Sequence, residues 1–177
     1  MTTPESGNVA IVIGASSTIA QALIKRLVEH EKRQVIAFTR RNNNLWQHSQ
    51  VDYYANDYSS EAIEQAVAGL QEYTGQIGRV FICNGVLHGD GFAPEKSLKK
   101  FDPAAFQQVL NANTLTPMLW LSRLLPLLKG RQACKVTAFS ARIGSITDNH
   151  LGGWYSYRAS KAALNMLLKT SAIELAR

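Results

Sequence analysis

Short apolar segments rich in β-branched residues alternate along this chain with longer segments of helical period. The strand-like segments cover residues 8–14, 34–39, 51–55, 78–84 and 133–140, and the helical segments cover residues 18–30, 59–73, 103–128 and 154–177. Alternation of this kind is typical of a parallel sheet with helices on both faces. We therefore predict an α/β fold with a doubly wound parallel sheet, in one domain that spans residues 1–177.

The segment between the first strand and the first helix is suited to binding a phosphate. The apolar run ends in a glycine and small residues then lead into the helix; these residues are Gly14, Ser16, Ser17, Thr18 and Ile19. Small side chains let the backbone approach a phosphate, and a helix N-terminus offers N–H groups and the positive end of its dipole. The segment predicts a dinucleotide pyrophosphate site, and a plain strand-to-helix turn is the alternative.

Tyr157 and Lys161 are four residues apart in the last helical segment, so both side chains leave the same helix face. A phenol with its ordinary pKa is a poor proton donor or acceptor at neutral pH. A neighbouring ammonium favours the phenolate and lowers the pKa of the phenol. The pair therefore predicts acid/base chemistry, and an ordinary exposed helix pair is the alternative.

The phosphate-type turn and the Tyr–Lys pair together resemble the short-chain dehydrogenase/reductase family, near its C-factor and sniffer-like carbonyl-reductase branch. Asn84 and Gly85 match the family's Asn-Asn-Ala-Gly signature after the fourth strand. Asn113 matches the active-site asparagine of the long helix, and Asp57 matches the aspartate that usually contacts adenine. The resemblance covers residues 8–177 and implies a Rossmann fold and a bound nicotinamide cofactor.

The resemblance also implies an activity and a role for each matching residue. The protein is expected to be an NADP(H)-dependent carbonyl reductase or alcohol dehydrogenase acting on a small-molecule carbonyl or alcohol. Tyr157 would be the general acid/base, and Lys161 would lower its pKa and bind the nicotinamide ribose. Asn113 would hold the water of a proton relay. The alternative is a cofactor-binding but catalytically weak protein of the same fold that acts in interaction or signalling.

Three positions depart from the family's pattern. Thr18 and Ala20 stand where the family has glycine, which adds bulk where the backbone should approach the pyrophosphate. Ala141 stands at the usual position of the catalytic serine. Ser140 and Ser145 flank it, and we take both as candidates for the hydroxyl that bonds the substrate carbonyl. Their alternative role is turn formation.

Two arginines follow the second strand, at the position where an acidic residue normally binds the ribose 2′-hydroxyl of NAD. This strand ends in Thr39 and is followed by Arg40 and Arg41. Because a guanidinium neutralises a 2′-phosphate, we expect NADPH to be preferred over NADH. The alternative is that both arginines face water.

The long helical segment has an expected start and an expected irregularity. Asp102 is a suitable N-cap, and Pro103 falls in the first turn, where a missing N–H costs nothing. Pro117 lies inside the same segment and deprives the carbonyl of Asn113 of its helical partner. We therefore expect a kink at Asn113.

Composition agrees with a soluble enzyme. Apolar residues make up 46% and charged residues 18%, without a membrane-spanning run or an N-terminal signal, so a cytoplasmic location is expected. The two cysteines are expected to be reduced, and the four histidines show no ligand spacing, so no metal is expected. The net charge is +6, but the basic residues occur in scattered pairs, which argues against a nucleic-acid partner.

Two features concern the chain's end and its association. The chain stops inside an apolar helix without a Gly or Asn cap, whereas members of the family continue through C-terminal strands and a substrate-binding segment. These parts are expected to be missing, in a fragment or in a reduced variant. The segments 118–128 and 162–168 are apolar around most of their circumference, which predicts a homodimer or homotetramer.

Overall fold

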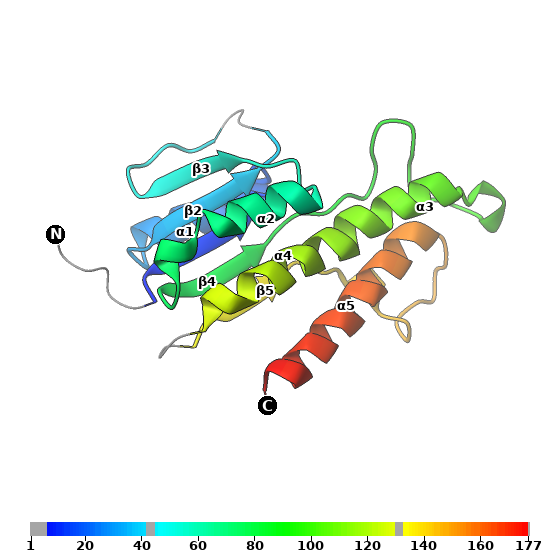
Figure 1. Cartoon of the computed structure of the whole chain (residues 1–177). Helices are drawn as coiled ribbons and strands as arrows, with labels where there is room; N and C mark the ends of the chain where they lie inside the picture. Colours follow the sequence, from blue (N-terminus) through cyan, green and yellow to red (C-terminus); the bar gives the residue numbers. More distant parts are fainter. Residues whose placement is uncertain (1–6, 42–44, 130–132, 177) are drawn as a thin grey trace. The chain divides into compact units, whose positions relative to one another are not determined.

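The computed structural model describes residues 7–41, 45–129 and 133–176 and contains a parallel five-stranded sheet of order β3-β2-β1-β4-β5 (Figure 1). The strands are β1 (Val9–Ile13), β2 (Gln34–Thr39), β3 (Val51–Ala55), β4 (Ile77–Ile82) and β5 (Lys135–Ala138). The predicted fold class is therefore confirmed. The last strand is shorter than the apolar run 133–140 suggests.

The described residues group into two compact units. The first comprises Met1–Asn84 and Leu119–Phe139 and holds the sheet, and the second comprises Gly85–Met118 and Ser140–Arg177.

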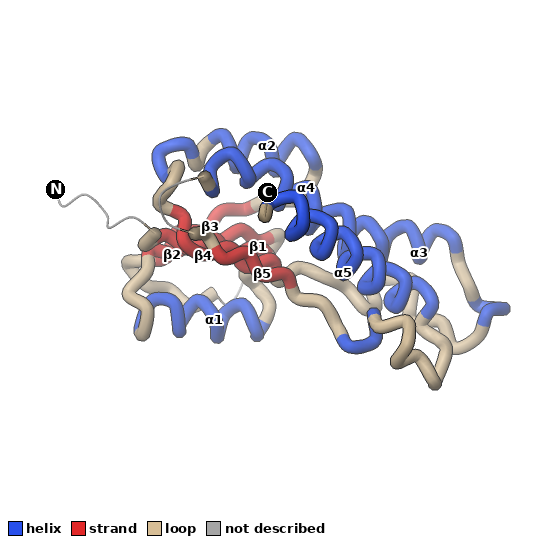
Figure 2. Tube along the Cα trace, turned by 90° about the horizontal axis from the view of Figure 1, so that it is seen from below, coloured by secondary structure: helices blue, strands red, loops and turns tan. Residues whose placement is uncertain are grey.

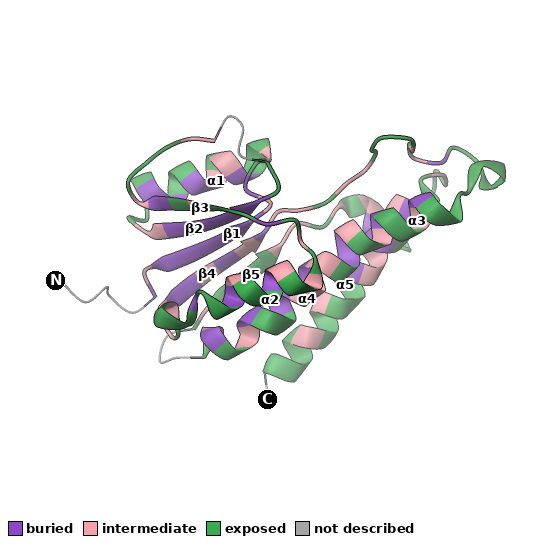
Figure 3. Ribbon diagram, turned by 45° about the horizontal axis from the view of Figure 1, so that its top comes forward, coloured by how far each residue is buried: buried purple, intermediate pink, exposed green. Residues whose placement is uncertain are grey.

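The sheet is buried at its centre. β1 is buried along its whole length, and its Ile11 pairs with Ile36 on β2 and with Val80 on β4. α1 (Thr18–Glu29) covers one face and α2 (Ser60–Ala68) covers the other (Figure 2). Cover on both faces explains why the central strands are almost continuously apolar rather than alternating (Figure 3).

α2 is shorter than the predicted helix 59–73. It ends at Ala68, Gly69 forms its C-cap, and a separate 3₁₀ turn follows at Gln71–Tyr73. Glycine is less favourable than alanine inside a helix by about 1 kcal/mol, so ending the helix at Gly69 costs little free energy.

The long helical segment is divided into several pieces. α3 (Pro103–Leu110) begins as predicted, because the Asp102 side chain accepts a bond from the N–H of Ala104 at 3.0 Å. A π-helical turn follows at Asn111–Leu115, and α4 (Thr116–Leu124) ends in a 3₁₀ turn at Leu125–Leu128. A kink was predicted at Asn113, and the structure has a π turn there, which ends at Leu115, two residues before Pro117.

The surplus of apolar surface predicted for residues 118–128 is not found. Trp120, Leu121, Leu124 and Leu127, which belong to the sheet unit, are all buried. Periodicity alone could not show this, because it records how apolar a helix is and not how much of it the neighbouring elements cover.

In the second unit α5 (Tyr155–Leu175) packs against α3 and against a 3₁₀ turn at Arg142–Gly144 (Figure 1). Its start agrees with the predicted segment 154–177, of which Arg177 lies outside the described residues. Within the described part of the chain, no helix is both long enough and apolar enough to cross a membrane.

Candidate cofactor-binding and active-site residues

Gly14 makes the turn after β1 and has the left-handed φ of +81° that favours glycine. Its N–H donates to the carbonyl of Phe38 at 2.9 Å, which continues the pairing of β1 with β2. A Cβ at this position would lie 2.6 Å from the backbone nitrogen of Asn84. The predicted turn residue Gly14 and the predicted signature residue Asn84 are therefore in close contact, and only glycine fits between them.

Ala20, one of the two residues that replace a family glycine in the phosphate-type turn, lies in the first turn of α1. Ser17 is the N-cap, and its Oγ accepts a bond from the N–H of Ala20 at 3.2 Å. The methyl group of Ala20 is fully buried in the core between α1 and the sheet, so it does not obstruct a ligand.

Thr18 and Ile19 are exposed, as is Ser16. Helix geometry leaves the first N–H groups of α1 without intrahelical partners. The turn therefore fits a pyrophosphate, with Thr18 as the one added side chain on its exposed side.

The ends of β2 and β3 form a second part of the predicted cofactor site. A hollow of about 430 Å³ is lined by Arg40 and Asp57, together with Ala55, Asn56 and Ala62. Arg40 and Asp57, which are predicted to bind the 2′-phosphate and the adenine, therefore line the same hollow. Arg41 does not line this hollow.

The side chains of Thr39 and Asp57 are held by local hydrogen bonds. Thr39 is buried, and its hydroxyl bonds the N–H and the carbonyl of Arg41 at 3.1 and 2.9 Å. Asp57 accepts a bond from the N–H of Ser59 at 2.8 Å, which lowers the pKa of its carboxyl group. Asp57 therefore stays ionised at neutral pH beside Arg40.

Tyr58 is a residue of this region that sequence reasoning missed. It has a φ of +69°, which is rare for a bulky residue, and its hydroxyl accepts from the N–H of Gly14 at 3.0 Å and donates to the carbonyl of Phe38 at 3.1 Å. The guanidinium of Arg40 lies 5.8 Å from the centre of its ring. Burial raises the pKa of Tyr58 to about 12, so the hydroxyl keeps its proton. Tyr58 thus supports both the glycine turn and Arg40.

In the second unit, Asn113 is fully buried and ties the segment after β4 to α5. Its Oδ1 accepts from the N–H of Val86 at 2.7 Å, and its Nδ2 donates to the carbonyl of Val86 at 2.8 Å and to the Oγ of Ser160 at 3.0 Å. Ser160 in turn donates to the carbonyl of Tyr157 at 2.9 Å. Sequence reasoning found Asn113 but missed Ser160, whose only signal was its position one turn after Tyr157.

Tyr157 and Lys161 share one face of α5, as their spacing predicts. The Nζ of Lys161 lies 5.8 Å from the ring centre of Tyr157, and Lys161 is buried. A Cβ added to Gly85 would lie 3.4 Å from this Nζ and 3.2 Å from the Oδ1 of Asn113. The structure therefore gathers Gly85, Asn113 and Lys161 at one place.

The pKa of Tyr157 is shifted in the direction opposite to the expected one. Burial raises the pKa of Tyr157, and burial also lowers the pKa of Lys161. Loss of solvent is therefore the dominant influence on the pKa values of both groups.

The two candidate serines differ in their surroundings. Gly144 is buried against α5, since an added Cβ would lie 2.8 Å from the backbone of Lys161, and Ser145 is the next residue in the chain. The Oγ of Ser145 also lies 3.3 Å from the hydroxyl of Thr147 and accepts from the N–H of Asp148 at 3.3 Å. Ser140 is exposed.

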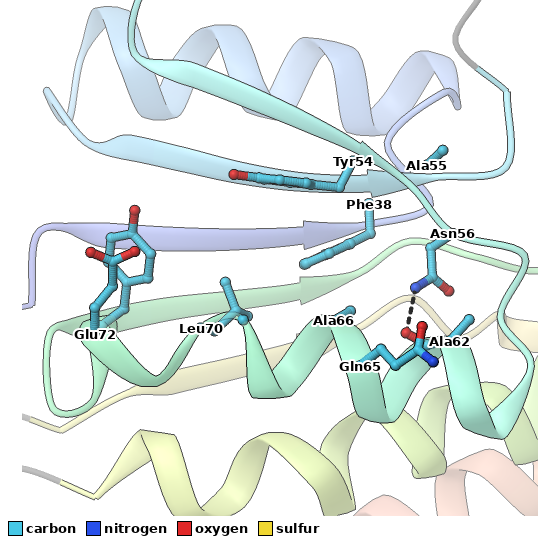
Figure 4. A pocket seen from close by; sticks show the side chains of 11 residues that line it. Phe38, Tyr54, Ala55, Asn56, Ala62, Gln65, Ala66, Leu70 and Glu72 are labelled. Atoms are coloured by element: carbon cyan, nitrogen blue, oxygen red, sulfur yellow. Dashed lines mark hydrogen bonds between the residues drawn. The ribbon is translucent and has the colours of Figure 1, made fainter.

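A cavity of about 320 Å³ lies along β2, β3 and α2 and includes Phe38, Tyr54 and Leu70 (Figure 4). None of the predicted site residues lines it. Cys83 and Cys134 are free thiols, and burial raises the pKa of Cys83 to about 12, which makes it a poor nucleophile. Among the described residues, no cluster of His, Cys, Asp and Glu side chains is suited to a metal ion.

A parallel sheet whose first strand ends in a glycine turn against an exposed helix N-terminus defines a dinucleotide-binding Rossmann protein. The chain belongs to the short chain dehydrogenase family, whose model matches residues 8–177. The predicted family is therefore confirmed.

Individual relatives agree with this assignment. The chain is 30% identical over 158 residues to the 1-hydroxy-2-glutathionyl-2-methyl-3-butene dehydrogenase of Rhodococcus sp. (strain AD45), covering 89% of this chain and 66% of that protein. The carbonyl reductase Sniffer of D. melanogaster has a TM-score of 0.82 at 22% identity, covering 95% of this chain and 75% of Sniffer. The NADPH-bound carbonyl reductase from chicken fatty liver has a TM-score of 0.80 at 21% identity, covering 96% and 71%.

The two solved structures are too distant in sequence to show more than the fold. The chain spans about half to two thirds of the length of the curated relatives that it matches.

Proposed function

We propose that this protein is an NADP(H)-dependent oxidoreductase that interconverts a small carbonyl compound and its alcohol. The observation that carries the proposal is the cluster in the second unit, where Tyr157 and Lys161 share a helix face and Lys161 approaches Gly85 and Asn113. The dehydrogenase of Rhodococcus sp. among the relatives supports the choice of reaction.

Residues of the sheet unit would hold the adenosine end of the cofactor. The exposed start of α1 suits the pyrophosphate, Asp57 suits the adenine, and Arg40 supplies a cation for a 2′-phosphate. When bound, a nicotinamide cofactor supplies or accepts the hydride of the reaction.

Residues of the second unit would move the proton. With a raised pKa, Tyr157 is protonated at neutral pH and is able to donate to a carbonyl oxygen. Lys161 would hydrogen-bond the nicotinamide ribose and stabilise the phenolate left after proton transfer. Asn113 holds α5 and the segment after β4 in place through three side-chain bonds, and in the proposed relay it would also position a water.

The proposal is tested by binding followed by turnover. NADPH should show enhanced fluorescence on binding, and it should then be consumed when reactive aldehydes are added. Binding without consumption would contradict the proposal. That result would favour the second candidate, a cofactor-binding protein that acts in interaction or signalling. The observation that favours this second candidate is Ala141 at the serine position, with the Ser145 hydroxyl held in a local turn.

Ser145 is the better candidate for the hydroxyl that bonds the substrate carbonyl, because it follows the glycine that packs on α5. We expect Ser145→Ala to lower kcat about 10- to 100-fold, since it removes a donor to the developing oxyanion. Ser140→Ala is the matched control and should leave kcat within about twofold, because Ser140 is exposed. Steady-state kinetics with a saturating aldehyde measures both, and a loss in Ser140→Ala alone would reverse the assignment.

We expect the protein to form homodimers or homotetramers through α5. This helix exposes two apolar side chains seven residues apart on one face, Met166 at 67% and Ile173 at 50% exposure. Burying such a face against a second copy removes apolar surface from water. Sedimentation velocity at micromolar concentration should show the dimer, and a stable monomer would contradict this expectation.

A further inference from the structure

We propose that Glu95 is a positioning residue that caps α5 from a distant loop and thereby holds Tyr157 in place. The role of α5 in proton transfer rests on the proposed function, whereas the cap itself is a property of the fold.

The start of α5 has an unusual backbone. Gly152, Gly153 and Trp154 have φ angles of +63°, +65° and +55°, so three consecutive residues are left-handed. Trp154 is the N-cap and makes no side-chain capping bond. A bulky residue in this conformation is strained, and the N–H groups of the first turn still require partners.

Glu95 supplies these partners from 61 positions away in sequence. Its backbone carbonyl accepts a bond from the N–H of Trp154. Its carboxylate accepts from the N–H of Ser156, at 3.3 Å to Oε1 and 3.2 Å to Oε2, and from the hydroxyl of Ser156. Glu95 is 5% exposed and Ser156 is 2% exposed. A buried carboxylate is thus fully engaged with the first turn of the helix.

This arrangement has an electrostatic and a geometric consequence. A negative charge at a helix N-terminus is stabilised by the helix dipole and by charge-assisted hydrogen bonds. Ser156 directly precedes Tyr157, and the ring of Trp154 meets the ring of Tyr157 edge-on at 6.3 Å. The turn that Glu95 holds is therefore the turn that carries the proposed acid/base.

Several other charged groups lie around this end of the helix. Lys96, Lys100 and Asp102 line a hollow of about 350 Å³ together with Glu95. Lys161 and Arg158 lie on α5, and the Nη1 of Arg158 approaches the carbonyl of Ile143, whose 3₁₀ turn also carries Arg142.

The first test compares Glu95→Ala with Glu95→Gln in the full chain. Glu95→Ala should lower kcat about 10- to 100-fold with little change in the KM for NADPH, because a displaced acid loses its alignment. Glu95→Gln keeps an oxygen acceptor and should recover part of the rate. A kcat for Glu95→Ala within about twofold of wild type, or a parallel loss of NADPH affinity, would overturn the proposal.

The second test does not depend on turnover. Glu95→Ala removes the carboxylate that accepts from the N–H of Ser156, so the amide hydrogen of Ser156 should exchange with solvent about 10-fold faster or more. Hydrogen exchange followed by NMR measures this rate. Glu174→Ala, an exposed substitution in the last turn of α5, is the control and should leave the rate unchanged. An unchanged Ser156 exchange rate in Glu95→Ala would overturn the proposal even if the chain proves to have no reductase activity.

Discussion

Tyr157→Phe is expected to lower kcat about 100-fold or more while leaving the dissociation constant for NADPH within about twofold. The lost hydroxyl donates its proton in the transition state, and it makes no ground-state contact with the adenosine end of the cofactor. Stopped-flow turnover and fluorescence titration measure the two quantities separately. Because the phenyl ring remains, the T-shaped contact with Trp154 is preserved and the fold should be unaffected.

Tyr155→Phe is the matched control, since Tyr155 is an exposed tyrosine in the same first turn of α5. It should keep the wild-type rate. A Tyr157→Phe variant that retains more than about a tenth of the wild-type rate would rule out the assignment of Tyr157 as general acid. Lys161→Ala should behave differently, because it removes a proposed ribose contact as well as a charge, and should raise the KM for the cofactor while lowering kcat.

Arg40→Ala is expected to weaken NADPH binding about 10-fold or more and NADH binding much less. Only NADPH carries the 2′-phosphate with which the guanidinium would pair. Arg40 lines the hollow that also contains Asp57, whereas the exposed Arg41 does not. Arg41→Ala is therefore the control, and its two dissociation constants should both stay near wild type. Equal losses for the two cofactors in Arg40→Ala would show that Arg40 contacts something other than the 2′-phosphate.

We expect a substitution that favours NADH to be effective at Arg40 rather than at Thr39. Thr39 occupies the strand end that carries the ribose-binding acid in NAD-dependent proteins of this fold. Its side chain is buried and bonded to the backbone of Arg41, so an aspartate there would be desolvated. Arg40→Asp places the carboxylate in the hollow instead, and it is the variant that we expect to favour NADH.

The sequence by itself determined the class of fold, the phosphate-type turn and the pairing of Tyr157 with Lys161. These features depend on residues close together in the chain. Strand and helix periodicity is set by the local order of residues, and so is the glycine that ends β1. The interval of four puts two side chains on one helix face in any helix. The cap at Asp102 and the irregularity at Asn113 were predictable for the same reason, since a cap and a proline act within one helical turn.

The tertiary structure alone decided which side chains are covered and which partners they meet. It buried Ala20 in the core, covered the apolar face of α4 and placed Arg40, rather than Arg41, in the hollow. It also raised the pKa of Tyr157, where the local spacing suggested a lower value.

The hydroxyl of Tyr58 reaches a backbone N–H 44 positions away, and the carboxylate of Glu95 reaches one 61 positions away. Burial and hydrogen bonds of this kind arise from contacts between segments distant in sequence, so no local pattern in the chain records them.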